Sequence, residues 1–276
     1  MSIFESILYG FISGIAEFLP VSSRGHQAIL RYMFGLDSRN FLQEFLVHIG
    51  ILIATIFACW DMLKRLQREN RALRVSARRR KAKFNSDEYY NLRLLKTATF
   101  TLVIGFTLHF VTIKMESNLL SVMTLFIING LILFLAAHSG HGNRDARTMT
   151  GLDGIIMGIL GSLSVFPGIS RVGITGSYTS LRGADYKNTI NWVILLGIPA
   201  LLFFIIFDLI GLFTYGAGIL SITALIGYIL SGSGAFCGGY FAISMLFTLI
   251  SYEGFTYFAY YSLGAALFSF MLYLIT

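Results

Sequence analysis

The sequence has few charged side chains and few residues that cross-link a fold. Only 13% of its 276 residues are Asp, Glu, Lys or Arg, whereas a soluble domain carries about 25%. Residues 209–252 contain none of these four types. The two cysteines, Cys59 and Cys237, lack CxxC or Cys/His spacing, which argues against a disulfide framework and a cysteine metal site. The composition therefore excludes an ordinary soluble domain.

Long apolar segments make up much of the chain. Hydrophobic residues make up 55% of the chain, and the mean hydropathy is +0.72. A membrane crossing needs about 20 apolar residues. The sequence thus predicts an all-α polytopic membrane protein with a single transmembrane domain, residues 1–276. Its apolar segments lie at about 44–60, 95–113, 119–137, 189–210, 217–230, 235–251 and 255–275.

Basic residues predict the orientation of the chain. More than half of its 21 Lys and Arg lie in one predicted loop, residues 61–96, and the next loop contains Arg144 and Arg147. Short basic loops stay on the cytoplasmic side of a membrane, so both loops are expected there. The net charge of +7 then indicates contact with anionic lipid heads, and no nucleic-acid partner is expected.

The first 18 residues have neither a basic region nor a cleavage site, so no signal peptide is expected.

Two apolar stretches, residues 6–30 and 152–176, are interrupted by polar residues. Both contain a P-x-x-S-R motif, Pro20 to Arg24 in the first and Pro167 to Arg171 in the second. Paired interruptions of this kind are typical of membrane proteins built from two repeats, with the binding site between them. We expect the first repeat at about 1–137 and the second at about 150–276.

The first polar stretch carries groups suited to catalysis. Glu17, Ser22, Ser23 and His26 offer a carboxylate, two hydroxyls and an imidazole, which supply an acid or metal ligand, a nucleophile and a base. Ionisable groups within a membrane are usually functional. Other interpretations stay open: Glu17 as an interfacial carboxylate, His26 as a hydrogen-bonded core residue, and either serine as a helix cap.

The second polar stretch predicts an anion site. Gly168 and Gly173 are expected to leave backbone N–H groups available as donors, and Ser170 and Thr175 add hydroxyls. Arg171 adds a guanidinium that can pair with two phosphate oxygens. The alternative for Arg171 is an anchor at the membrane interface. Asp208, at the end of an apolar segment, is expected to mark that interface.

These motifs resemble a known family. GxxEFLPVSSxGH, from Gly14 to His26, and PGxSRxGxT, from Pro167 to Thr175, are similar to motifs of the undecaprenyl-diphosphate phosphatase family of bacitracin-resistance proteins. The similarity continues through residues 45–60, 196–208 and 255–267, and so covers nearly the whole chain.

The resemblance implies a fold of inverted repeats with two re-entrant helix hairpins. It also implies hydrolysis of the terminal phosphate of undecaprenyl diphosphate, which recycles the lipid carrier of peptidoglycan synthesis, assisted by a divalent cation, Mg²⁺ or Ca²⁺. By matching positions, Ser23 is expected to be the nucleophile or its close neighbour, His26 the proton-transfer partner, Glu17 an acid/base or metal ligand, and Arg171 the phosphate clamp. The expected phosphate-binding residues are Ser22, Arg24, Gly168, Ser170, Gly173 and Thr175.

Three positions depart from the family pattern. Ser13 stands where the family has a second glutamate, Arg24 follows the paired serines where a small residue is usual, and Val172 replaces a hydroxyl residue. Losing a carboxylate and gaining a cation shift the site toward anion binding with less metal. A polyprenyl-phosphate flippase or binding protein that does not hydrolyse its lipid is therefore the alternative function, and an inert membrane scaffold is a third.

The expected location is the bacterial plasma membrane, with the site cavity opening outward. This follows because segment 44–60 ends at the cytoplasmic basic loop, so its beginning faces the outside. The expected partner is a polyprenyl phosphate or diphosphate lipid. A homodimer is left open.

Overall fold

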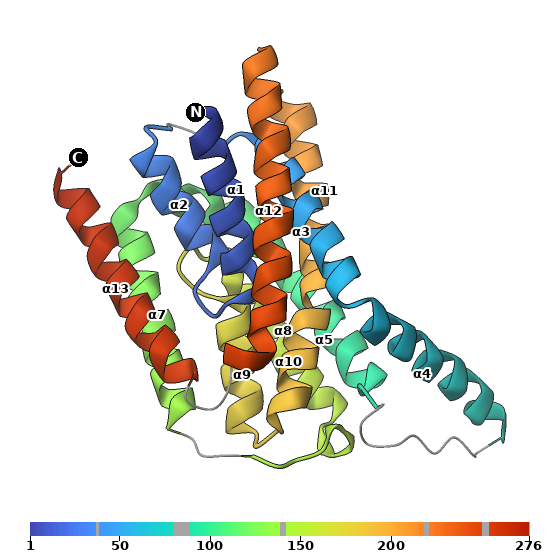
Figure 1. Ribbon diagram of the computed structural model, residues 1–276. Helices are drawn as coiled ribbons and strands as arrows, with labels where there is room; N and C mark the ends of the chain where they lie inside the picture. Colours follow the sequence, from blue (N-terminus) through green and yellow to red (C-terminus); the bar gives the residue numbers. More distant parts are fainter. Residues whose placement is uncertain (37–38, 80–88, 139–141, 218–220, 250–253, 276) are drawn as a thin grey trace.

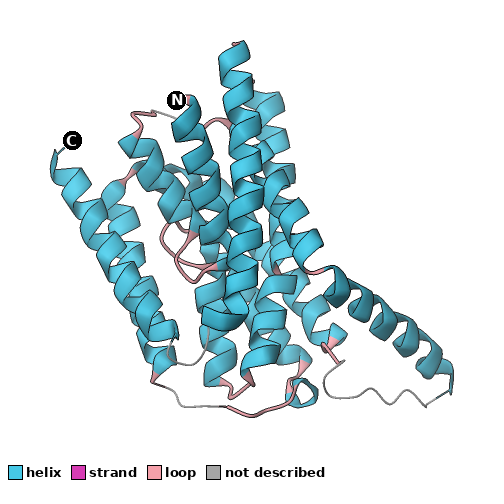
Figure 2. Cartoon of the chain, viewed as in Figure 1, coloured by secondary structure: helices cyan, strands magenta, loops and turns pink. Residues whose placement is uncertain are grey.

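The computed structural model describes residues 1–36, 39–79, 89–138, 142–217, 221–249 and 254–275, which are almost entirely helical (Figure 2). Within these ranges, β-type pairing is limited to an isolated bridge between Arg144 and Ala184. The predicted all-α fold is confirmed. The helices in chain order are α1 (Ile3–Phe18), α2 (Ser23–Met33), α3 (Phe41–Ala58), α4 (Trp60–Arg79), α5 (Leu92–Gly105), η2 (Phe106–Leu108), α6 (His109–Thr112), η3 (Ile113–Ser117), α7 (Leu119–Ala137), η4 (Ala146–Thr148), α8 (Gly151–Ser162), η5 (Leu163–Val165), α9 (Arg171–Leu181), α10 (Tyr186–Leu195), α11 (Gly197–Tyr215), α12 (Ile222–Leu249) and α13 (Gly254–Ile275).

Six helical stretches among the described residues are long and apolar enough to cross a membrane, which confirms a multi-pass membrane protein. Two of them are interrupted. The second continues from α5 through short turns of helix, and the fourth changes from α10 to α11 at Leu196. The six stretches are Phe41–Ala58, Leu92–Ser117, Leu119–Ala137, Tyr186–Tyr215, Ile222–Leu246 and Phe255–Ile275.

The predicted division into segments 217–230 and 235–251 is wrong, because α12 runs through both as one helix. In its Ser-Gly-Ser-Gly sequence at residues 231–234, the two glycines lie against neighbouring helices instead of breaking the chain. A Cβ added at Gly50 of α3 would lie 2.1 Å from the Gly232 oxygen, and one at Gly14 of α1 would lie 2.3 Å from the Ala235 oxygen. Small residues let membrane helices approach this closely, so here they indicate packing and not a loop.

Substitution of Gly50 by alanine is expected to lower the thermal unfolding temperature of the purified protein in detergent. The added methyl group overpacks the contact between α3 and α12, at a cost of about 1–3 kcal/mol. Gly264→Ala in α13 is the matched control, because nothing lies within 4 Å of the added Cβ. The control should keep or raise the unfolding temperature. Equal losses in both variants would contradict this packing.

Much of the predicted basic loop 61–96 is helix α4, while residues 80–88, including Arg80 and Lys81 of its basic run, lie outside the described residues. Glu69 connects α4 to the start of α5 by hydrogen bonds. Its carboxylate accepts hydrogen bonds from the backbone N–H groups of Tyr90 at 2.9 Å and Leu92 at 2.7 Å. Burial raises the pKa of this carboxyl group, and the two N–H donors oppose the rise.

Two helix hairpins place their tips inside the helix bundle (Figure 1). The first consists of α1 and α2, and the second of α8 with η5 and then α9. Each hairpin packs on a helix from the other half of the chain. In the first hairpin α1 packs on α12, and in the second α8 packs on α5. The division into repeats at about 1–137 and 150–276 stays a prediction.

The two predicted cytoplasmic segments lie together at one end of the bundle. The side-chain nitrogen of Asn91, at the start of α5, donates to the carbonyl oxygens of Ala146 and Met149, both at 2.8 Å. The N-terminus lies at the opposite end (Figure 1). The common location agrees with the expectation that both segments face the same side of the membrane.

Candidate active site

The first hairpin tip is a short irregular segment held by Ser22. α1 ends at Phe18, Pro20 cannot continue the helical hydrogen bonds, and α2 begins at Ser23. Ser22 caps α2, with its hydroxyl oxygen accepting from the Gly25 N–H at 3.3 Å. Its φ of 66° lies in the left-handed region. A non-glycine residue in this conformation is strained, which is common at functional sites.

The second hairpin tip has a similar design. It spans residues 166–170, and Ser170 caps α9 by accepting from the Gly173 N–H at 3.1 Å. Gly168 has a φ of 125°, and a Cβ there would lie 2.6 Å from the Leu125 Cβ. Gly168 is therefore required both by its backbone conformation and by its close approach to α7.

Hydrogen bonds between serine side chains and backbone groups join the two tips directly. The Gly168 N–H donates to the Ser22 hydroxyl oxygen at 3.0 Å, and the Ser170 hydroxyl donates to the Leu19 carbonyl at 3.2 Å. A Cβ on Gly25 would lie 3.1 Å from the Gly168 nitrogen. Segments separated by about half of the chain thus meet at one place.

A small cavity of about 20 Å³ lies where the tips meet. A volume of this size holds about one water molecule. Six of the sequence-predicted site residues line it, together with Ala16, Ser164, Ile169 and Phe204. The six are Glu17, Ser22, Ser23, Arg24, Ser170 and Arg171.

Arg171 is one of two buried cations that line this cavity, with its side chain 4% exposed. It pairs with the Glu17 carboxylate at 3.3 Å and donates to the Val193 carbonyl at 2.6 Å, where α10 nears its end. Its Nε has no hydrogen-bond partner in the described part of the chain. Gly197 makes room for it, because a Cβ there would lie 3.1 Å from the Arg171 guanidinium. A buried guanidinium with an unsatisfied donor is suited to bind an anion.

Ser23 lines the cavity, and among the described residues its hydroxyl has no hydrogen bond to a carboxylate or imidazole that could act as a base. Its hydroxyl donates to the Ser13 carbonyl at 3.3 Å. His26 does not line the cavity: its Nδ1 contacts the Ser22 carbonyl at 2.8 Å, and its Nε2 contacts the Tyr261 hydroxyl at 2.7 Å. A carbonyl only accepts hydrogen bonds, so Nδ1 carries a proton, and in the neutral ring Nε2 accepts from Tyr261. The predicted role of His26 stays a prediction, and it requires the bond to Tyr261 to break.

Three other predicted phosphate-binding residues do not line the cavity. The Thr175 hydroxyl donates to the Arg171 carbonyl at 2.6 Å, within its own helix. Gly173 contributes its N–H to the Ser170 cap, and Gly168 contributes its N–H to Ser22. In this conformation they shape the tips, and their contact with phosphate stays a prediction.

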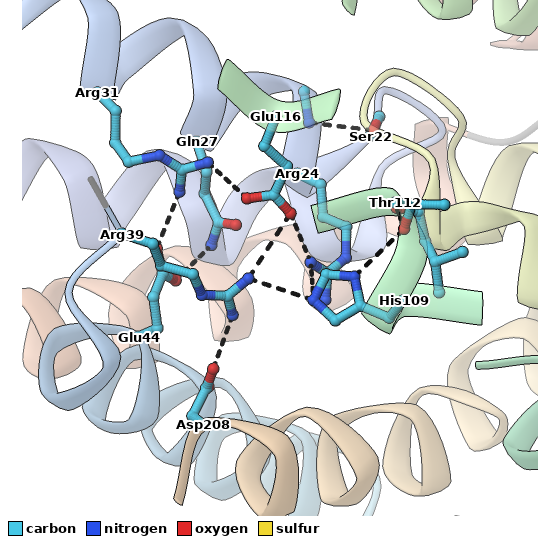
Figure 3. A network of polar contacts seen from close by, with 12 residues as sticks. Ser22, Arg24, Gln27, Arg31, Arg39, Glu44, His109, Thr112, Glu116 and Asp208 are labelled. Carbon is cyan, nitrogen blue, oxygen red and sulfur yellow. Dashed lines mark hydrogen bonds and ion pairs between the residues drawn. The ribbon is translucent and has the colours of Figure 1, made fainter. Parts of the chain in front are cut away.

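Arg24 connects the cavity to a larger polar network (Figure 3). Its guanidinium lies 2.8 Å from the Glu116 carboxylate and 3.1 Å from Nε2 of His109, over the ring of Phe204 at 3.9 Å. The sequence indicated neither Glu116 nor His109. A signal was present, since both are ionisable residues within a predicted membrane segment or at its end.

Asp208, which is expected to mark the membrane interface, has a completely buried side chain. It pairs with Arg39 at 2.7 Å and with Nδ1 of His48 at 2.6 Å. Buried charges require partners. The partners of Asp208 come from distant sequence positions, which explains why its location was not predictable.

Asn129 of α7 was also missed, although it holds both tips. Its side-chain nitrogen donates to the Pro20 carbonyl at 3.1 Å and to the Ser262 hydroxyl at 2.9 Å. Its side-chain oxygen accepts from the Ser170 N–H at 2.9 Å. An amide in the middle of an otherwise apolar segment was the signal for it.

Asn129→Leu is expected to reduce activity and lower the thermal unfolding temperature, since the Pro20 carbonyl and Ser170 N–H lose their partner. Each unsatisfied buried group costs about 1–3 kcal/mol. Thr124→Val, which removes an exposed hydroxyl bonded within the same helix, is the control and should leave both properties unchanged. An Asn129→Leu protein as stable and as active as the control would show that Asn129 does not hold the tips.

Comparison with known proteins gives a consistent result over the whole length. The family model described as "Bacitracin resistance protein BacA" matches residues 6–268. An undecaprenyl-diphosphatase of Treponema denticola is 33% identical over 262 residues, covering 95% of this chain and 94% of its own. One of Alkaliphilus metalliredigens is 31% identical over 265 residues, covering 95% of both chains. One of Carboxydothermus hydrogenoformans is 29% identical over 265 residues, covering 95% and 94%.

Proposed function

The chain belongs to the bacitracin resistance protein BacA family, and we propose that it hydrolyses the terminal phosphate of undecaprenyl diphosphate. The names of its relatives support hydrolysis over lipid transport without hydrolysis. The observation that carries the proposal is the cavity between the two tips, where Ser23, Glu17 and Arg171 meet. The products would be undecaprenyl phosphate and inorganic phosphate.

In the proposed reaction, Ser23 attacks the terminal phosphorus. The bond from its Oγ to phosphorus forms as the bond to the bridging oxygen breaks, so undecaprenyl phosphate leaves. Water then attacks the phosphoserine and releases inorganic phosphate. Glu17 lines the cavity with Ser23, whereas His26 does not, so we assign the serine proton to Glu17.

Positive charge is the main requirement of phosphoryl transfer, because charge spreads over the oxygens of the transferred group. Arg171 and Arg24 both line the cavity. Substrate phosphate would replace Glu17 as the partner of Arg171 and satisfy its unpartnered Nε. A phosphate group needs more space than one water molecule, so the tips have to separate when substrate enters.

The residues fit a divalent cation only if it arrives with the substrate. The described residues include no cluster of three or more His, Cys, Asp or Glu, and Glu17 is the single carboxylate at the cavity. Mg²⁺ commonly takes one or two carboxylates together with substrate phosphates. With Glu17 as its protein ligand, Mg²⁺ or Ca²⁺ would supply further positive charge at the diphosphate.

Isothermal titration of the purified protein with MgCl₂ should therefore show no stoichiometric binding in the absence of lipid diphosphate. A site held by one carboxylate cannot dehydrate Mg²⁺ on its own. Addition of a non-hydrolysable diphosphate analogue should create binding. Tight binding of one Mg²⁺ to the lipid-free protein would contradict this arrangement.

We also propose that the hairpins are re-entrant and that the site opens to the outside of a bacterial plasma membrane. Both basic segments lie at one end of the bundle, which the positive-inside rule assigns to the cytoplasm. One large pocket at Arg31 and Arg39 is lined by Met1, and the N-terminus lies at the opposite end (Figure 1). This placement supports access from outside.

Proteoliposomes that contain undecaprenyl diphosphate test the function against its alternative. We expect phosphate release that depends on protein and on Arg171. Transbilayer movement of lipid phosphate, without phosphate release above that of protein-free vesicles, would reject hydrolysis in favour of transport.

A further inference from the structure

Three buried arginines converge on one carboxylate next to the candidate active site (Figure 3). Glu116 lies 2.8 Å from Arg24, 2.6 Å from Arg31 and 3.6 Å from Arg39. All four side chains are less than 10% exposed. Arg24 and Arg31 lie on α2, Arg39 precedes α3, and Glu116 lies on the short helix η3. Arg24, Arg31 and Arg39 thus form a three-arginine cluster around Glu116.

The members of the cluster differ in how far they depend on Glu116. Arg31 also pairs with Glu44 at 3.2 Å, and Arg39 also pairs with Asp208 at 2.7 Å. Arg24 has no second carboxylate within ion-pair distance among the described residues. If Glu116 moved away, three cations would face two anions, and an incoming anion would restore neutrality.

The cluster also has unused hydrogen-bonding capacity. Nε of Arg39 is buried and has no partner within the described ranges. Guanidinium groups bind phosphate through pairs of parallel N–H donors. A carboxylate held by three guanidiniums occupies the position that a phosphate group would take, with fewer acceptor oxygens than phosphate offers.

The cluster lies between the tip cavity and open space. Arg24 lines the tip cavity of about 20 Å³. Arg31, Arg39 and Glu116 line an open pocket of about 630 Å³, and the two arginines also line a neighbouring pocket of about 660 Å³. Glu116 and Arg24 therefore form a contact between the site where phosphate would be released and the pockets through which it could leave.

We propose that Arg24, Arg31 and Arg39 form a second phosphate-binding site, which Glu116 closes and a phosphate group occupies when Glu116 moves away. The ligand class is a tetrahedral phosphate, either inorganic phosphate or the head group of a lipid monophosphate. Its use as the exit site for released phosphate rests on the proposed hydrolysis. Binding itself does not.

Equilibrium binding of inorganic phosphate and of undecaprenyl phosphate to the purified protein in detergent tests the site. Arg171→Ala serves as the background, because it removes the other candidate phosphate site. Adding Glu116→Gln should tighten binding by about tenfold or more, since a carboxylate beside a bound anion is strongly repulsive. Adding Arg24→Gln to that protein should remove the gain.

The controls separate local effects from changes in charge or folding. Glu69→Gln removes one buried carboxylate away from the cluster and should leave phosphate affinity unchanged. If the Glu116→Gln protein unfolds at so low a temperature that it aggregates, Glu116→Asp replaces it in the test. Aspartate keeps the charge on a shorter side chain, so a smaller gain in phosphate affinity is expected.

A gain for inorganic phosphate assigns the site to the released product, and a gain for the lipid alone assigns it to the head group. No gain with either ligand in folded Glu116 variants, or a gain that persists without Arg24, would overturn the proposal. These measurements involve no turnover. A protein that binds phosphate here but releases none from the diphosphate would contradict the proposed function and leave this site standing.

Discussion

Replacement of Arg171 by alanine is expected to reduce kcat/KM for phosphate release by roughly 10³-fold or more, the size of effect seen when an arginine that stabilises a transferred phosphoryl group is removed. Arg171 is the buried cation that faces Glu17 at the tip cavity. Arg171→Lys should recover only part of the rate, because an ammonium group cannot bind two phosphate oxygens in parallel. Initial rates with undecaprenyl diphosphate in detergent give the measurement.

The control for Arg171 lies near the other end of the same helix. Arg182 pairs with Asp153 at 2.8 Å and is 45% exposed, so Arg182→Ala should keep nearly full activity. Arg171 also holds the Val193 carbonyl, so its loss can destabilise the fold by about 3–5 kcal/mol. The thermal unfolding temperatures of both variants show whether a lower rate comes from loss of folded protein. A folded Arg171→Ala protein with near-normal kcat/KM would contradict the assignment.

Replacement of Ser23 by alanine is expected to reduce kcat by roughly 10⁴-fold or more, as loss of a nucleophile does in serine hydrolases, with little change in stability. Its hydroxyl makes one long hydrogen bond, 3.3 Å to the Ser13 carbonyl. Ser22→Ala should show the opposite pattern. Ser22 caps α2 and accepts from the Gly168 N–H, so its loss should cost about 0.5–2 kcal/mol of stability and less of the rate.

The paired serines thus allow a direct comparison of two adjacent hydroxyls. Rates and unfolding temperatures should be measured on both variants under the same conditions. If Ser22→Ala abolished phosphate release while Ser23→Ala retained it, the nucleophile would be Ser22 or a water molecule, and the role of Ser23 would be rejected.

Local sequence patterns predicted the parts of the fold that depend on local physics. Charge depletion and apolar segments predicted a membrane protein, and the predicted interruption that begins at Pro20 lies just after the end of α1. The shared P-x-x-S-R motif predicted that residues near Pro20 and Pro167 belong to similar structures, and the structure places the two tips in contact. The error at residues 217–251 arose because glycine and serine can mark either a break or a close helix contact.

The remaining features depend on contacts between distant segments. Nothing next to Glu116 in the sequence indicates that Arg24 and Arg31 bind it. His26 illustrates the same limit, because its partner Tyr261 comes from α13. A resemblance to a family predicts the types of residues at a site, but hydrogen-bond partners are decided by packing.

The most direct test of the central claim is mass-spectrometric analysis of the lipid after incubation of undecaprenyl diphosphate with the purified protein in detergent. We expect undecaprenyl phosphate and an equal amount of inorganic phosphate, with neither formed by the Arg171→Ala protein. Unchanged undecaprenyl diphosphate after incubation with folded wild-type protein, with or without Mg²⁺, would contradict it.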